Sequence, residues 1–382
     1  MAELNGITWR HTRGYIPMVA TAQRFCELNP DVRIRWQARS LQEFADSPLE
    51  QLTAQFDLLV IDHPSVGEAA GHHILLPLDE WLPSAFLADQ TLHSVGRSHE
   101  SYFLDGHQWA LAIDAAAPVS GYREDLLHRA GVEIPGTWPE LLALAKRGLV
   151  AVPGLAIDSL MNFYMLCGAI GEEPFQNPDQ IVGEDTGIRA LEMLRGLLQL
   201  CDPACFHRNP IATWELLSSS DGPAYCPFAY GYSNYSRQGY SNHVLTTGGL
   251  VTMDGGKVLR STLGGAGLAI SAKCSHKEIA ACYAQYVAGF NCQKSLYFYS
   301  GGQPGHRAAW LDDEVNRGAN NFFKNTIAAL DAAYLRPRFN GYLHFQQQGA
   351  RIVHGYLLAG GDERTVIREL TQSLRDAQRT KL

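Results

Sequence analysis

Polar residues gather directly behind the first apolar run of this 382-residue chain, ITW at 7–9. The stretch that follows, HTRGY, holds two bases, a hydroxyl and a phenol, and a helix-like segment begins at once after it. A guanidinium offers a planar fork to a carboxylate or phosphate, and a helix start also attracts anions. We therefore expect a ligand-binding role, the alternative being a solvated loop with a surface salt bridge. The residues concerned are His11, Thr12, Arg13 and Tyr15.

A second apolar run, FDLLVIDHP at 56–64, ends in Asp62 and His63. Either residue could contact a ligand, although Asp62 could instead serve only as a helix cap. If the protein is an enzyme, His11 or His63 would be its base, and Asp62 or Asp114 the partner of that base. The chain contains no GxSxG, Walker or HExxH motif, so we expect binding rather than catalysis, with Asp114 among the ligand contacts.

Tyrosine, glycine and asparagine crowd the segment FAYGYSNYSRQGY at 228–240. A tyrosine ring supplies flat apolar area and a hydroxyl, which suits stacking on the face of a sugar or heterocycle. We expect a wall of the binding site here, the alternative being a rigid packed loop. The candidate residues are Tyr230, Tyr232, Asn234 and Tyr235.

The segment RPRFNGYLHF at 336–345 adds Arg336, Arg338 and Tyr342 to the candidates. Its arginines could bind a carboxylate or phosphate, or could form a salt bridge between domains. Together with Arg13 they indicate an anionic ligand.

The spacing of apolar residues predicts the sheet that holds these loops. Strands are expected at 7–9, 32–36 and 57–61, the last being a continuous apolar run typical of a strand covered on both faces. A helix kinked near Pro48 is expected at 40–55. This order indicates a doubly wound α/β domain, in which ligands bind beyond the carboxyl ends of the strands.

A second sheet is expected to begin with a strand at 119–122. The helix after that strand should end at Gly131, in the usual position of a terminating glycine. Thr137 then has the place of an N-cap, because Trp138-Pro139-Glu140 puts proline in the first helical turn.

The composition excludes several classes of protein. The net charge of −8 and pI near 5.9 argue against nucleic-acid binding, which needs a basic face. No apolar run approaches the ~20 residues of a membrane span. The amino terminus lacks the features of a secretory signal. A cytoplasmic protein is therefore expected from the chain as written, and a periplasmic one if this is a processed form.

No cofactor, metal or disulfide is expected. Cys201 and Cys205, in CDPAC, are the one close pair among eight cysteines, and no second pair completes a zinc site. Scattered thiols in apolar stretches suit the reduced state. LGGAGLA at 263–269 lacks the third glycine of a dinucleotide-binding loop.

Several motifs together resemble a known family, the extracellular solute-binding proteins of ABC transporters, family 1, in its maltose-binding-like branch. The most specific is a tyrosine–polar–x–acid–leucine helix followed by alanine-glycine, a proline and a Thr-Trp-x-Glu-Leu helix start, although Arg123 stands where an asparagine is usual. Weaker matches keep the family's order along about 7–370. The matching segments are YREDL, AG, the proline Pro135, TWPEL, AQRFCELNPDVRI, LLPLDEWLP, the stretch at 262–293 and GGQPGHRAAW.

The resemblance implies a two-lobe α/β fold of the periplasmic-binding-protein type, with crossing hinge segments and a ligand cleft between the lobes. Lobe 1 would comprise 1–113 and 264–306, and lobe 2 would comprise 114–263 and 307–382.

On this basis we expect a monomeric protein that captures a small polar metabolite, anionic or sugar-like, and delivers it to an ABC permease if it is exported. The alternative is a cytoplasmic sensor, carrier or enzyme on the same scaffold that acts on an anionic metabolite.

Overall fold

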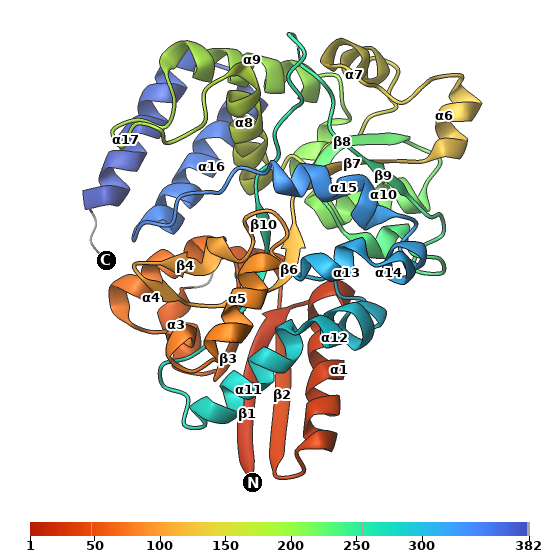
Figure 1. Cartoon of the computed structure of the whole chain (residues 1–382). Coiled ribbons are helices and arrows are strands. Elements are labelled where there is room, and N and C mark those ends of the chain that lie inside the picture. Colours follow the sequence, from red (N-terminus) through yellow and green to blue (C-terminus); the bar gives the residue numbers. More distant parts are fainter. Residues whose placement is uncertain (47, 254, 380–382) are drawn as a thin grey trace. The chain divides into compact units, whose positions relative to one another are not determined.

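The computed structural model describes residues 1–46, 48–253 and 255–379 (Figure 1). The chain forms two compact units. Unit 1 consists of Met1–Ala116, Gly264–Arg317 and Arg338–Asn340, and unit 2 of Ala117–Leu263, Gly318–Pro337 and the chain from Gly341 on. The lobes expected from the sequence differ from these units at 114–116, 307–317 and 338–340.

Unit 1 is built on a five-stranded sheet of order β2-β1-β3-β10-β6. β1 pairs in parallel with β2 and β3, whereas β10 runs antiparallel to both β3 and β6. The three predicted strands are confirmed as members of one sheet, and β3 is buried along its whole length, which explains its unbroken apolar sequence. The strands are β1 (Ala2–Trp9), β2 (Val32–Arg39), β3 (Leu58–Ile61), β6 (Leu111–Ala116) and β10 (Gly264–Ile270).

Helices cover both faces of this sheet (Figure 1). One core lies between the sheet and the helices α1 and α11, where Met18, Phe25 and Tyr283 are buried. The other lies against α3 and α4. Besides the five strands, unit 1 contains α1 (Thr12–Leu28), α2 (Leu41–Asp46), α3 (Leu49–Thr53), η1 (His63–Ser65), α4 (Val66–His72), η2 (Leu78–Glu80), α5 (Ser84–Leu92), η3 (Glu100–Tyr102), β4 (Phe103–Leu104), β5 (His107–Gln108), α11 (Lys277–Ala288), α12 (Phe290–Cys292), η6 (Gln293–Tyr297), α13 (Arg307–Leu311) and α14 (Asp313–Gly318).

The helix expected at 40–55 is interrupted near Pro48, as predicted, and becomes α2 and α3. Ser40 and Glu43 cap α2 reciprocally: the Glu43 N–H donates to Ser40 Oγ (3.1 Å), and the Ser40 N–H to Glu43 Oε2 (2.6 Å). Pro48 precedes α3, where a residue without an N–H is tolerated.

Unit 2 contains a three-stranded antiparallel sheet of order β8-β7-β9, separate from the sheet of β3 as predicted. Beside it, α8, α9, α16 and α17 pack against one another. The elements are β7 (Pro118–Tyr122), α6 (Glu124–Ala130), α7 (Trp138–Ala145), α8 (Ala156–Ile170), α9 (Glu184–Leu198), η4 (Pro203–His207), α10 (Pro210–Ser219), β8 (Tyr225–Tyr230), η5 (Ser233–Ser236), β9 (Thr246–Gly248), α15 (Phe322–Asp331), α16 (Tyr342–Ala359) and α17 (Glu363–Arg379).

The two helix boundaries predicted in unit 2 are confirmed. Gly131 ends α6 in the left-handed region (φ 63°), which glycine adopts without strain. Thr137 caps α7 in a complete capping box with Glu140. Among the described residues, no helix is both long and apolar enough to cross a membrane.

Candidate functional site

The stretch HTRGY forms the start of α1 at the carboxyl end of β1. His11 is the N-cap, and its Nδ1 accepts a hydrogen bond from the Arg13 N–H (3.0 Å). Thr8, in β1, donates from its hydroxyl to the Gly14 carbonyl (3.0 Å) and ties the turn to the strand. The expectation that HTRGY forms a loop is therefore wrong, because these residues build the first turn of a helix.

Arg13 is buried and paired with a buried carboxylate. Only 4% of the residue is exposed, and its Nε and Nη2 donate to the two oxygens of Asp114 at 2.7 and 2.5 Å. Burial raises the pKa of Asp114, and the guanidinium of Arg13 opposes that rise. The bidentate geometry is that of a charged pair, so Arg13 holds β6 to α1 rather than lying on a loop outside the core.

Gly265 lets β10 pass beside Asp114. Its φ is +110°, and an added Cβ would lie 2.4 Å from the Asp114 carbonyl oxygen. The register of β10 against β6 shifts between Ala266 and Gly267. The glycines of LGGAGLA thus serve a strand that bends past the Arg13–Asp114 pair.

His11, Thr12 and Tyr15 are half-buried at this edge of the sheet. Burial and the nearby Arg13 charge lower the pKa of His11 to about 3. The ring is therefore neutral and carries its proton on Nε2, because Nδ1 accepts. The Thr12 hydroxyl makes no hydrogen bond with another described residue. Tyr15 packs on the core and its hydroxyl reaches the Trp36 carbonyl at 3.5 Å, away from the helix start.

Asp62 and His63 follow β3 at the same edge. Asp62 caps η1 by accepting from the His63 N–H (2.9 Å), and its side chain is 20% exposed. The His63 ring is buried, with Nδ1 3.2 Å from Asp62 Oδ1 and its edge against Tyr102. Of these two residues, Asp62 is the one whose side chain keeps an exposed surface that a ligand could contact.

Arg336 and Arg338 each have partners in the protein. Arg336 is buried in unit 2 and donates to Gln346 Oε1 (3.0 Å). Arg338 belongs to unit 1, where its Nη1 donates to the carbonyl oxygens of Glu100, Ser101 and Phe103 at 2.8, 3.1 and 2.6 Å. Arg338 thereby fixes the turn before β4.

The tyrosine-rich segment packs mainly into unit 2. Tyr232 and Tyr235 belong to a core with Trp214, and Asn234 is 1% exposed. Tyr230, at the end of β8, is half-buried with its hydroxyl 3.2 Å from Thr262 Oγ1. The packed-loop alternative fits these positions, with Tyr230 keeping an exposed surface.

Tyr342 opens α16 and is fully buried in a group of aromatic rings that includes Phe175 and Phe345.

Comparison with solved structures gives matches over nearly the whole chain. Maltose-bound MalE3 of T. maritima is 17% identical with a TM-score of 0.85, over 98% of this chain and 100% of that one. A solute-binding protein of an ABC transporter from Agrobacterium radiobacter, in complex with ribitol, is 17% identical with a TM-score of 0.83, over 99% and 98%. One from Agrobacterium vitis with bound D-mannitol is 16% identical with a TM-score of 0.79, over 99% and 98%.

The fold is that of the maltose-binding-like solute-binding proteins. No protein-family model matches the chain. A mannitol-binding protein of Pseudomonas aeruginosa is 28% identical over 151 residues, which are 38% of this chain. The match spans 34% of that relative's length.

Asp158 is a candidate residue of this solute-binding fold that sequence reasoning missed. It lies in the first turn of α8, fully buried, and its Oδ2 has no hydrogen-bond partner among the described residues. Burial raises the pKa of Asp158 to about 8. A neutral carboxyl can both donate and accept, which suits a hydroxyl. The signal was an aspartate near the start of the mostly apolar run AIDSLMNFYML.

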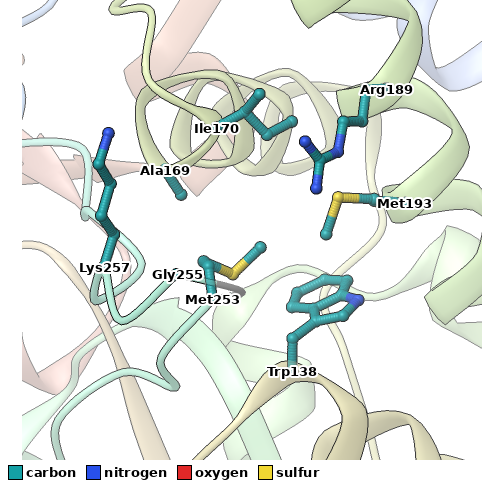
Figure 2. A pocket seen from close by; sticks show the side chains of 8 residues that line it. All are labelled: Trp138, Ala169, Ile170, Arg189, Met193, Met253, Gly255 and Lys257. Carbon is teal, nitrogen blue, oxygen red and sulfur yellow. The ribbon is translucent and has the colours of Figure 1, made fainter.

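Figure 2 shows a surface pocket of about 140 Å³ in unit 2. Trp138 lies at the bottom of this view, with Lys257 at the left and Arg189 at the upper right. None of the residues predicted from the sequence lines it, so the pocket is unrelated to the predicted site. The complete lining is Trp138, Ala169, Ile170, Arg189, Met193, Met253, Gly255 and Lys257.

Asp89, His93 and His306 bring potential metal-ligand atoms within 4.8 Å of one another in unit 1. However, Nδ1 of His306 accepts from the Ala308 N–H (3.3 Å), so the neutral ring carries its proton on Nε2, which faces Asp89 Oδ2 (3.3 Å). His93 Nδ1 lies 2.9 Å from Asp89 Oδ1. Asp89, His93 and His306 therefore form a hydrogen-bonded group. A metal ion between them would need a lone pair of His306, and that lone pair is on Nδ1, which accepts from Ala308 instead.

Proposed function

We propose that this protein is the solute-binding component of an ABC-type importer and captures a small polyol or sugar-like solute. The observation that carries the proposal is the match of nearly the whole chain to solute-binding proteins solved with maltose, ribitol and D-mannitol. The shorter sequence match to a mannitol-binding protein supports the same ligand class. The proposal includes capture between two lobes by a hinge motion, which the family resemblance implies.

The proposed ligand contacts are four candidates that keep some exposed surface, together with the buried carboxyl of Asp158. In unit 1 these are His11, Thr12 and Asp62, at the carboxyl ends of β1 and β3, where open α/β sheets bind ligands. In unit 2 they are Tyr230 and the buried carboxyl of Asp158. A neutral imidazole, two carboxyl groups and two hydroxyls supply the donors and acceptors that a polyol requires.

Arg13, Arg336 and Arg338 no longer argue for an anionic ligand, because each donates to groups of the protein itself.

The proposal implies a small-molecule ligand and a membrane permease as partners. It also implies that the protein acts outside the cytoplasm.

A thermal-shift screen tests the proposal. A ligand that binds the folded state alone raises the free energy of unfolding by RT ln(1 + [L]/Kd), about 2.7 kcal/mol at a concentration of 100 Kd, and so raises the melting temperature. The panel is maltose, ribitol, D-mannitol, D-sorbitol and D-tagatose, with glycerol as the matched small polyol expected to be inert. A dose-dependent rise for at least one panel member supports the proposal. No rise for any sugar or polyol would contradict it.

A further inference from the structure

Arg39, the last residue of β2, is buried with unused hydrogen-bond donors. It is 8% exposed, and its Nη2 donates to the Val60 carbonyl (3.2 Å). Its Nε and Nη1 have no hydrogen-bond partner among the described residues. Arginine has five N–H donors and no acceptor, so this side chain keeps several strong donors unsatisfied.

The charge of Arg39 has no direct ion-pair partner among the described residues. No described carboxylate lies within ion-pair distance. Glu43, the acid that acts on it through space, is itself bound to the Ser40 cap. The backbone N–H of Arg10 donates to the Arg39 carbonyl, and the Arg10 charge acts on the same carboxylate, Glu43, as Arg39 does. Burial lowers the pKa of Arg39 to about 10, so it stays protonated at neutral pH.

Trp9 holds a second buried donor, at the end of the neighbouring strand. Trp9 and Arg39 are register partners at the ends of β1 and β2. The indole is 4% exposed, and its Nε1 has no hydrogen-bond partner among the described residues. Phe44, from α2, covers both: its ring centroid lies 5.2 Å from that of Trp9 and 5.4 Å from the Arg39 guanidinium carbon.

Buried donors without acceptors are expensive for a fold. Each unsatisfied group lowers the stability of the folded state, and a charged group lowers it more than a neutral one. Arg13 shows the contrast, because it lies at the same edge of the sheet and its Nε and Nη2 are met by Asp114. An arginine that served only to hold β2 in place would be expected to find an acceptor in the same way.

We propose that Arg39 and Trp9, under the ring of Phe44, form a subsite for an anionic group of the ligand, a carboxylate or a phosphate. This inference rests on the proposed function and narrows its ligand class to acidic sugar or polyol derivatives. The guanidinium offers its fork to two oxygens of the group, and the indole N–H offers a third hydrogen bond. Phe44 turns aside when the group enters, because the donors are covered in the ligand-free chain.

Calorimetric titration with matched ligands tests the proposal. The probes are D-mannitol, D-mannonate and D-mannitol 1-phosphate, which differ at one end of the same carbon chain. The wild-type protein should bind mannonate or the phosphate roughly ten- to hundred-fold more tightly than mannitol, as a charge-assisted hydrogen bond implies. Arg39→Met should abolish that preference while leaving mannitol affinity unchanged. Arg35→Met, on the exposed part of β2, is the matched control and should keep the preference.

Thermal unfolding of the ligand-free variants gives a second readout. Arg39→Met removes an unpaired buried charge and should leave the melting temperature equal or higher, whereas loss of a purely structural arginine would lower it. Trp9→Phe, which removes the indole donor and part of the ring area, should lower mannonate affinity less than Arg39→Met does.

The possible outcomes distinguish a failure of the Arg39 subsite from a failure of the proposed function. Binding of mannitol with no preference for the acids, or a preference that survives in Arg39→Met, overturns the subsite and leaves the proposed function intact. An equal loss of mannitol and mannonate binding in Arg39→Met assigns a structural role and also overturns the subsite. If neither these probes nor the wider sugar panel binds, the proposed function itself fails.

Discussion

Arg13 and Asp114 are 101 positions apart in the chain and meet as a buried pair. From the local sequence, Arg13 is a base behind a strand, and Asp114 is an acid in an apolar run. Their pairing is settled by the position of β6 in the sheet, which local patterns do not encode. For this reason the expectation that Arg13 lies on a loop, outside the core, was wrong.

Replacement of Arg13 by methionine should destabilise the ligand-free protein. The change leaves Asp114 buried without its partner, which costs about 3–5 kcal/mol. Chemical denaturation should show this loss. The double variant Arg13→Met with Asp114→Leu should recover much of it, because both charges are then gone. An unchanged melting temperature in the single variant would mean that the pair is not buried as described.

Asp158 should make stability depend on pH. Its folded pKa of about 8 is above the ordinary value of 3.8, so the folded state favours the proton. The contribution of Asp158 to stability is therefore fully present below pH 4, and it is lost as pH rises towards 8, by up to about 1.4 kcal/mol per pH unit. Asp158→Asn should remove this dependence and be the more stable protein at pH 7–8. Parallel pH profiles of the two proteins would show that Asp158 titrates normally.

At the level of elements, the strands and caps followed from local chemistry. The apolar run of β3, the Gly131 terminus and the Thr137 cap each depend on neighbouring residues alone. The tyrosine-rich segment was harder to interpret, because the same residues suit a binding wall and a core. Which one they form depends on Trp214 and α10, which lie elsewhere in the chain.

Thr137→Ala should destabilise unit 2 by about 1 kcal/mol, since the α7 N-cap loses its hydrogen bond from the Glu140 N–H. Thr137→Ser keeps the hydroxyl and should be close to wild type. The measurement is the denaturation midpoint. Ligand affinity should stay constant in both variants. An alanine variant as stable as the serine variant would show that the capping box contributes nothing.

At the scale of the whole molecule, the order of weak motifs was more informative than any one of them. The resemblance from that order agrees with the fold found in the solved relatives. The position of each side chain within that fold did not follow, since 17% identity conserves backbone arrangement better than contacts.

The eight cysteines should all titrate as thiols under denaturing, non-reducing conditions. None is in a disulfide in the described chain, and burial raises the pKa of Cys201 to about 12 and of Cys205 to about 11. In the native state Cys282, the exposed one, should react first. A denatured count two short would implicate Cys201 and Cys205.

Isothermal titration calorimetry with the best sugar or polyol from the thermal screen is the decisive measurement of solute binding by this protein. We expect one ligand per chain with a dissociation constant on the order of 1 µM or tighter, which corresponds to a binding free energy of about −8.2 kcal/mol. Thr12→Val and Asp62→Asn should weaken that binding while leaving the melting temperature of the ligand-free protein nearly unchanged, because both side chains are partly exposed. Titrations without heat for every sugar and polyol of the panel, and for D-mannonate and D-mannitol 1-phosphate, would contradict the proposal of a solute-binding protein.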